Sequence, residues 1–179
     1  MGKIRMKKLP SLAFVFFLVS CANPLNDVTY GRYTDAGDSA MNRGDYIQAE
    51  AAYSRAAQNV DWGHLGPAAK SGSLFNLANA KIRMKRYAEA EPLLLESLKI
   101  EKRISGEQAL FTQKRNIALA MVYLELNQPE LGLPYLRQTL PLALSQDFIG
   151  LRAKLYPSYV NLLERLGKNE DAMPFRLQK

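Results

Sequence analysis

The stretch KRYAEAEPLLLESL, residues 85–98, combines a short polar turn with the beginning of an amphipathic helix. Small and apolar residues recur in it at spacings of three and four, at Ala90, Leu94, Ser97 and Leu98. This spacing places them on one face of an α-helix. The residues before the turn follow the same period, and strand signals are nearly absent downstream. The sequence therefore predicts an all-helical domain.

Three further segments align with this one: GDYIQAEAAYSRAA from residue 44, NQPELGLPYLRQTL from residue 127 and GKNEDAMPFRLQK from residue 167. The four begin at intervals of 41, 42 and 40 residues, at Gly44, Lys85, Asn127 and Gly167. Glycine and asparagine tolerate the left-handed conformation that ends a helix, so Lys85 is an exception. Small residues recur inside each segment at Ala49, Ala90, Gly132 and Ala172, and upstream at Gly37, Ala78 and Ala120, with Val160 in the last unit. Such residues let two helices approach closely.

Each turn is expected to join two helices. The predicted pairs cover residues 31–43 with 47–59, 68–85 with 88–104, 108–126 with 130–145, and 151–166 with 169–179. Prolines at positions 92, 134 and 174 lie near the start of a second helix, where the missing amide would have no intrahelical partner. Residues 59–73, rich in glycine, form the longest connection between units, and we expect them to be partly irregular.

This repeated pattern resembles the tetratricopeptide repeat (TPR) over roughly residues 30–179, nearly the whole chain after its first segment. The usual repeat has about 34 residues. The longer spacing here, up to 42 residues, is similar to the subtype found in kinesin light chains and many bacterial proteins. The resemblance implies an all-α fold, a right-handed α-solenoid of about four helix-turn-helix units that binds a protein or peptide partner.

In this family the first helix of each unit offers polar side chains to a peptide bound on the concave face. By resemblance, the candidate groove residues are Asn76, Asn79, Arg83, Asn161 and Arg165. Asn76 in FNLANA matches the family's groove asparagine, whereas Asn116 in the similar NIA falls two places early and is not assigned that role. Amides can bond the backbone of an extended peptide, and arginine can bind a carboxylate. Ordinary exposed helix surface is the alternative interpretation.

The first twenty residues are typical of a signal peptide. Four bases, without an acid, precede an apolar run at residues 12–19, which is too short for the roughly 20 residues that span a bilayer. The sequence Leu18-Val19-Ser20-Cys21 then resembles the lipobox of bacterial lipoproteins. The resemblance implies that residues 1–20 are removed and that Cys21 is lipidated, leaving residues 21–29 as the lipidated cysteine and linker. Cys21 as the end of an uncleaved anchor is the alternative.

The same resemblance predicts where the chain is found. In Gram-negative lipoproteins, an aspartate directly after the cysteine resembles a signal that retains the protein in the inner membrane. Here that residue is Ala22, so the signal is absent. We therefore expect a lipid-anchored protein of the bacterial cell envelope, at the outer membrane and facing the periplasm.

Charge and composition argue against several other functions. The whole chain has a formal charge of +7, but the part from Cys21 onward has 20 bases against 17 acids. This mild excess gives no reason to expect nucleic-acid binding, which needs a concentrated basic face. The single histidine, His64, and single cysteine form no catalytic or metal-binding motif, so we expect no enzyme, cofactor or metal.

Two other features have competing interpretations. Trp62 is expected to pack the Gly-rich connection onto the first two units, with a role as a partner anchor as the alternative. The basic run KIRMKR, residues 81–86, is interpreted as a solvated helix end.

The leading functional hypothesis is a lipid-anchored scaffold that binds a protein partner of an assembly, secretion or wall-synthesis complex. The alternative is a structural component that self-associates, as a homodimer for example, through its C-terminal end. Met173, Phe175 and Leu177 are expected to be partly uncovered there, although fraying of the end would explain the same pattern. An enzyme is the third and weakest hypothesis.

Overall fold

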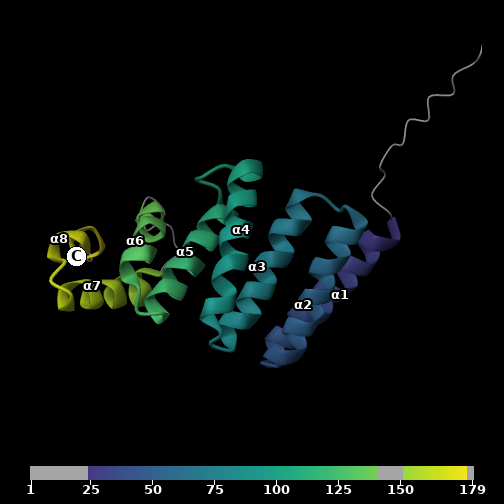
Figure 1. The fold of residues 1–179 in the computed structure, drawn as a ribbon, viewed down its shortest axis with the longest axis horizontal. Coiled ribbons are helices and arrows are strands. Elements are labelled where there is room, and N and C mark those ends of the chain that lie inside the picture. The colour runs from purple at the N-terminus through teal and green to yellow at the C-terminus, as the bar shows by residue number, and fades with distance from the viewer. Residues whose placement is uncertain (1–23, 141–150, 177–179) are drawn as a thin grey trace, which may run out of the picture.

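The computed structural model describes residues 24–140 and 151–176, and within them the backbone is helical apart from short turns. The elements are α1 (Pro24–Arg43), α2 (Tyr46–Gly63), α3 (Pro67–Arg83), α4 (Tyr87–Ser105), α5 (Leu110–Glu125), α6 (Pro129–Gln138), the π-helical turn η3 (Leu151–Leu155), α7 (Tyr156–Arg165), α8 (Asn169–Ala172) and the 3₁₀ turn η4 (Met173–Phe175). Each helix packs on its neighbours in sequence, and the molecule extends as a row of antiparallel pairs (Figure 1). The predicted all-α solenoid is confirmed.

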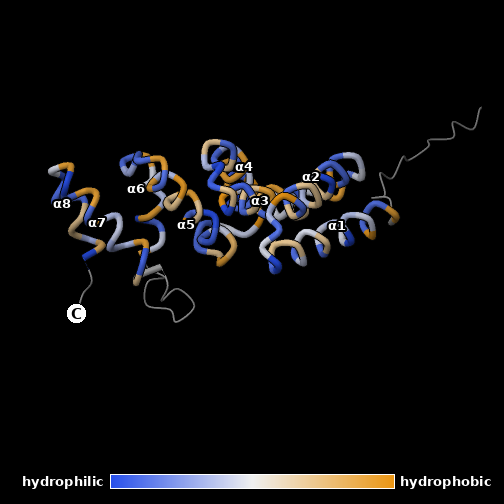
Figure 2. Tube along the Cα trace, turned by 90° about the horizontal axis from the view of Figure 1, so that it is seen from below, coloured by the Kyte–Doolittle hydropathy of each residue, from blue (hydrophilic) through white to orange (hydrophobic). Residues whose placement is uncertain are grey.

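The helices form two layers. Seen at right angles to the first view, α2, α4 and α6 follow one side of the row, and α1 and α5 lie on the other (Figure 2). Between the layers, buried apolar side chains form three successive clusters, centred on Tyr53, Leu94 and Tyr159. This succession is the continuous core expected when helical repeats stack.

The four predicted turns have the same backbone geometry. Gly44, Lys85, Asn127 and Gly167 have positive φ angles of 77°, 61°, 58° and 75°. In each turn the following amide bonds back across the helix end, as in Arg86 N to the Lys81 carbonyl at 2.9 Å and Gln128 N to the Tyr123 carbonyl at 2.8 Å. This pattern is the Schellman motif, which satisfies carbonyls that the helix end leaves without partners. Lys85 therefore adopts the left-handed conformation despite its side chain.

The recurring small residues lie where helices meet. Ala49, Ala90 and Ala172 are fully buried. A Cβ atom added to Gly37 would overlap the Tyr53 ring, and one added to Gly132 would overlap the Tyr159 hydroxyl. Both glycines are thus required by a tyrosine packed against them. The expectation of close helix approach at these positions is confirmed.

Several helix boundaries differ from the prediction. α1 begins at Pro24 and not at residue 31, so residues 24–29 are helical and do not form an extended linker. α2 continues to Gly63 and α3 starts at Pro67, which leaves three residues of the expected irregular connection outside a helix. The left-handed His64 and Gly66, with φ of 50° and 91°, make this sharp turn. α6 ends at Gln138, and the predicted extension beyond residue 140 lies outside the described residues.

The prolines of the second helices lie deeper than predicted. Pro92 and Pro134 are the sixth residues of α4 and α6, beyond the first turn whose amides have no intrahelical partner. Each therefore removes a helical hydrogen bond. Both prolines are exposed, and so are Ala88 and Glu130 four positions earlier, so the freed carbonyls face solvent. Hydration of those carbonyls makes the prolines tolerable inside the helices.

The expected uncovered C-terminal end is wrong for Phe175. Its side chain is 1% exposed and packs edge-on against Tyr156, with ring centroids 5.3 Å apart. Met173 is 62% exposed, and Leu177 lies outside the described residues. The turn η4 folds Phe175 back onto α7, because a short terminal segment with one large apolar residue can still cover the last core cluster. Phe175 was the largest of the apolar side chains on which the hypothesis of self-association through the C-terminal end was based, and it is not exposed.

We expect Lys85→Gly to raise the free energy of unfolding by about 1 kcal/mol. The left-handed conformation costs roughly that much for a residue with a Cβ atom, and glycine avoids the cost. Lys99→Gly, in the exposed interior of α4, is the matched control and should lower the free energy of unfolding by about 1 kcal/mol. Urea denaturation followed by circular dichroism measures both. Equal destabilisation by the two substitutions would contradict the analysis of the turn.

Candidate peptide-binding surface

The candidate groove residues of α3 lie on one face of the helix. Asn76, Asn79 and Arg83 are spaced by three and four residues, and the two asparagines are half-buried while Arg83 is exposed. Arg83 donates a hydrogen bond of 2.7 Å to the Tyr46 hydroxyl, and its guanidinium lies 5.1 Å from the Tyr46 ring centroid. Within the described residues, neither asparagine side chain has a hydrogen-bond partner. The face thus offers two free amides beside an oriented arginine.

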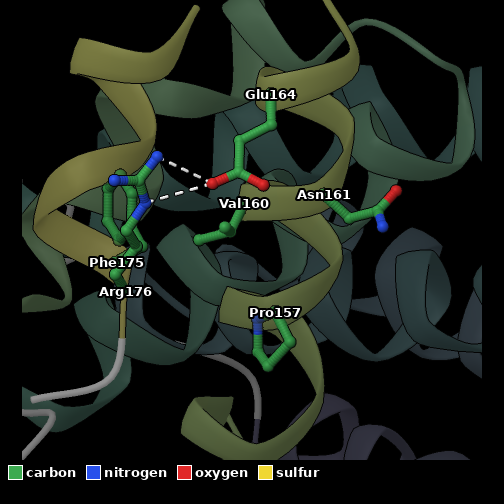
Figure 3. A pocket seen from close by; sticks show the side chains of 6 residues that line it. All are labelled: Pro157, Val160, Asn161, Glu164, Phe175 and Arg176. Atoms are coloured by element: carbon green, nitrogen blue, oxygen red, sulfur yellow. Dashed lines mark hydrogen bonds and ion pairs between the residues drawn. The ribbon is translucent and has the colours of Figure 1, made fainter.

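The candidates on α7 repeat part of this arrangement. Asn161 and Arg165 follow Asn79 and Arg83 by 82 residues, two repeats later, and both are exposed. Asn161 lies at the rim of a shallow depression of about 350 Å³ that is also lined by Phe175 (Figure 3). On its other side, the Arg176 guanidinium donates two hydrogen bonds to Glu164, of 2.8 and 3.1 Å.

The structure does not join the two sets into one polar surface. α5 lies between them, and its residues at the equivalent positions are Met121 and Glu125. Met121 is half-buried and packs against two of the core clusters. Asn116 is 1% exposed, so it belongs to the interior and lies away from any groove. The predicted residues therefore form two sites, with Met121 between the asparagines and the exposed acid Glu125 between the arginines.

The basic run at residues 81–86 is tied down by acids of neighbouring helices. Lys81 Nζ lies 2.5 Å from Glu50 and 3.0 Å from Glu89, and Arg86 contacts the same two carboxylates. Hydrogen bonds from Arg86 and then Lys81 lower the pKa of Glu89 to about 2. A hydrogen bond from Lys81 is the main cause of the lowered pKa of Glu50. The network joins α2, α3 and α4, so the interpretation as a merely solvated helix end is wrong for these two cations.

A second polar cluster, absent from the sequence predictions, is buried where α3, α4 and α5 meet. Arg115 forms an ion pair with Glu101 at 3.1 Å, and the two side chains are only 4% and 6% exposed. Arg115 also donates to Ser97 Oγ at 2.7 Å, and its guanidinium lies 4.7 Å from the Phe75 ring centroid. The Ser71 hydroxyl donates a hydrogen bond of 2.8 Å to Glu101 Oε2, the carboxylate oxygen that also pairs with Arg115.

Burial is the main influence on the Arg115 pKa. Desolvation lowers this pKa, and the Glu101 carboxylate partly offsets the effect. Arginine still remains charged near neutral pH because its ordinary pKa is far above 7. The hydrogen bonds around the pair satisfy groups that would otherwise be costly to bury. In the sequence, Arg115 could have been identified only as a charge on the apolar face of its predicted helix.

Other side chains with possible chemistry stand apart from one another. His64 is exposed at the end of α2, where its amide bonds back to the Val60 carbonyl. Trp62 is 76% exposed, so the expectation that it packs onto the first two units is wrong. Among the described residues there is no group of histidine, cysteine and acidic side chains suited to a metal ion, and none of the helices is long and apolar enough to cross a membrane.

Arg115→Met is expected to lower the free energy of unfolding by about 3–5 kcal/mol, because it leaves Glu101 buried without its ion-pair partner. Replacing both residues by methionine should recover most of that loss, since the uncompensated charge is then gone. Arg137→Met provides the control: its ion pair with Asp171 is exposed, and its loss should cost less than about 1 kcal/mol. Denaturant unfolding measures all three, and a double variant no more stable than Arg115→Met would refute the explanation.

Comparison with known proteins supports the repeat interpretation. Residues 71–145 match the family model described as tetratricopeptide repeat. No curated protein matches the chain. Among solved structures, the crystal structure of BtubC (BKLC) from P. vanneervenii is similar, with a TM-score of 0.72 and 17% sequence identity. The match covers 84% of this chain and 61% of BtubC, so the chain spans about three fifths of that protein's length. At this identity the likeness establishes the fold alone.

Proposed function

We propose that the chain is a lipid-anchored TPR scaffold of the bacterial cell envelope, which binds a protein partner and carries out no chemical step. One observation carries the binding part of the proposal. Asn76 and Asn79 offer unpaired amides on the same face of α3 as Arg83, whose guanidinium is oriented by Tyr46. Amides suit the backbone of an extended peptide, and a pre-oriented arginine suits a carboxylate. The expected occupant is therefore a peptide segment with an acidic residue.

The spacing of the turns supports assignment to the long-repeat subtype. The left-handed residues recur at intervals of 41, 42 and 40 positions, and the helices of the first two pairs have 17 to 20 residues each. Longer first helices provide a deeper face on which a partner can bind. The second polar site, at Asn161 and Arg165, lies two repeats away and would contact a different part of the partner.

The anchor part of the proposal rests on the sequence before the first helix. The signal peptide and Cys21 lie outside the described residues. α1 begins at Pro24, so only two residues separate it from Cys21. Three residue steps span at most about 11 Å. Lipidation of Cys21 would therefore hold the beginning of α1 against the bilayer. The membrane we propose is the outer membrane, because Ala22 stands in place of the aspartate that resembles the retention signal.

Lipidation predicts that the protein incorporates a fatty-acid label through Cys21. An alkyne analogue of palmitate should label the wild type, whose intact mass should equal residues 21–179 plus acyl groups. Cys21→Ser should lose the label and retain residues 1–20, because the signal is cut only after the thiol is modified. Ser20→Ala, which keeps a small residue before the cysteine, should be labelled normally. An unlabelled wild type with residues 1–20 still present would disprove the anchor.

The groove assignment predicts a selective loss of partner binding. After mild crosslinking in cells, Arg83→Glu should lose the partners captured by the wild type, because it reverses the charge offered to an acidic peptide. A hot-spot loss of about 2 kcal/mol corresponds to a roughly 30-fold weaker affinity. Helical circular dichroism should be unchanged.

Arg55→Glu is the matched control for that experiment. Arg55 is an exposed arginine with its guanidinium 6.0 Å from the Tyr33 ring centroid, but it lies on α2, in the layer of second helices. Mass spectrometry should find the same partners with Arg55→Glu as with the wild type. Equal capture by all three proteins would show that the face of α3 is not the binding surface.

A further inference from the structure

Six of the ten large apolar side chains that are exposed in the described residues lie at one edge of the solenoid. This edge is where α1 begins, α2 gives way to α3, and α4 gives way to α5, and it is the upper edge in Figure 1. The side chains are Leu25, Val28, Trp62, Ile104, Leu110 and Phe111, which are between 42% and 76% exposed. They belong to separate helix ends. We call this set the N-terminal edge.

Two of these residues lie together on the same side of the first helix pair. α1 and α2 are antiparallel, and Asn26 packs so closely on Gly63 that a Cβ atom there would lie 2.6 Å from the Asn26 Cβ. Leu25 and Trp62 each precede one of these contact residues. In an antiparallel pair, the residues before a contact turn toward the same side, because each is rotated by about 100° from it. Leu25 and Trp62 thus face the same side of the first helix pair.

Basic side chains accompany the apolar ones at the other end of the same edge. Residues 102–114 contain three bases and one acid, Glu107. Lys114 Nζ lies 5.5 Å from the Phe111 ring centroid. Lys102 lies 3.5 Å from Glu107, and Arg103 is exposed. Aromatic residues with bases beside them are typical of protein surfaces at the boundary between lipid headgroups and acyl chains.

We propose that the N-terminal edge lies on an anionic lipid surface, with Trp62, Leu25 and Phe111 inserted at the level of the headgroups. The proposal extends the lipid anchor argued above and rests on it. The described chain begins at this edge, with Pro24, and Cys21 precedes it by three positions. An anchor of that reach brings the edge to the bilayer. The three bases of residues 102–114 match anionic headgroups, and at the other end of the edge the Asp61 carboxylate is paired with Lys70 at 2.7 Å. The lipid then covers apolar side chains that the fold leaves in water.

The chain has a single tryptophan, so its fluorescence reports on this edge alone. The full-length lipoprotein is reconstituted into vesicles of phosphatidylethanolamine and phosphatidylglycerol, with and without brominated acyl chains. We expect the Trp62 emission to shift to the blue on reconstitution and to fall at least twofold with brominated lipid. Phe111→Ser with Leu110→Ser should reduce the quenching, because these side chains hold the far end of the edge on the lipid.

A matched variant supplies the control. Trp62→Phe combined with Ile47→Trp moves the probe to a residue that is also 76% exposed, at the opposite end of α2. The two positions are 15 residues apart, about 22 Å along the helix. The new tryptophan should remain unshifted and unquenched. Equal quenching at both positions would overturn the orientation of the edge.

The remaining outcomes separate this proposal from the anchor on which it rests. Flotation with the vesicles without any quenching of Trp62 would overturn the edge proposal and leave the anchor intact. Failure to float, together with an unacylated Cys21, would overturn both. A blue shift that appears without lipid and disappears on dilution would show that a second copy covers the edge, which also overturns the proposal.

Discussion

The close approach of paired helices is the constraint on which the structure depends. Two antiparallel helices that are joined by a turn of two or three residues must pass close together, so the residues at the crossing have to be small. Ala49, Ala90 and Ala172 meet this condition by full burial. Gly132 meets it so strictly that even a methyl group would overlap the Tyr159 hydroxyl, which donates a 2.6 Å hydrogen bond to the Ala120 carbonyl. The tyrosine therefore connects the third unit to the fourth through the space that glycine leaves.

The same constraint explains which parts of the fold could be predicted from the sequence. Turn residues and small residues act locally and recur at a fixed spacing, so the repeat, the helix pairs and the left-handed turns were all predictable. Lys85 was the exception in residue type, yet the hydrogen bonds of the turn impose the left-handed conformation on it. Periodic signals also located most helix boundaries to within a few residues.

Features that depend on distant partners were not predictable. Glu101 and Arg115 are 14 residues apart in sequence, and only the packing of three helices shows that they are a buried pair. Trp62 was expected to be covered and Phe175 to be exposed, whereas the structure places them the other way round. In both cases, whether a neighbouring helix reaches the side chain decides its burial. Within the candidate groove, the repeat pattern placed Asn76, Asn79 and Arg83 on one face of α3, but it did not show that Met121 lies between this face and the candidates on α7.

The two proposed surfaces are related by the length of one helix. α3 starts at the N-terminal edge with Pro67, so Asn76 lies about 14 Å and Arg83 about 24 Å along the helix from that edge. The headgroup layer is only a few ångströms deep on each side of the hydrocarbon. If the edge rests on the bilayer, these residues therefore lie beyond the headgroups. The polar site would then be too far from the bilayer to contact lipid. It could contact a peptide segment that projects from another protein. The short connection to Cys21 would limit that height, because two residues leave the beginning of α1 little slack to rise from the bilayer. An anchor this short therefore favours partners that are themselves held near the membrane.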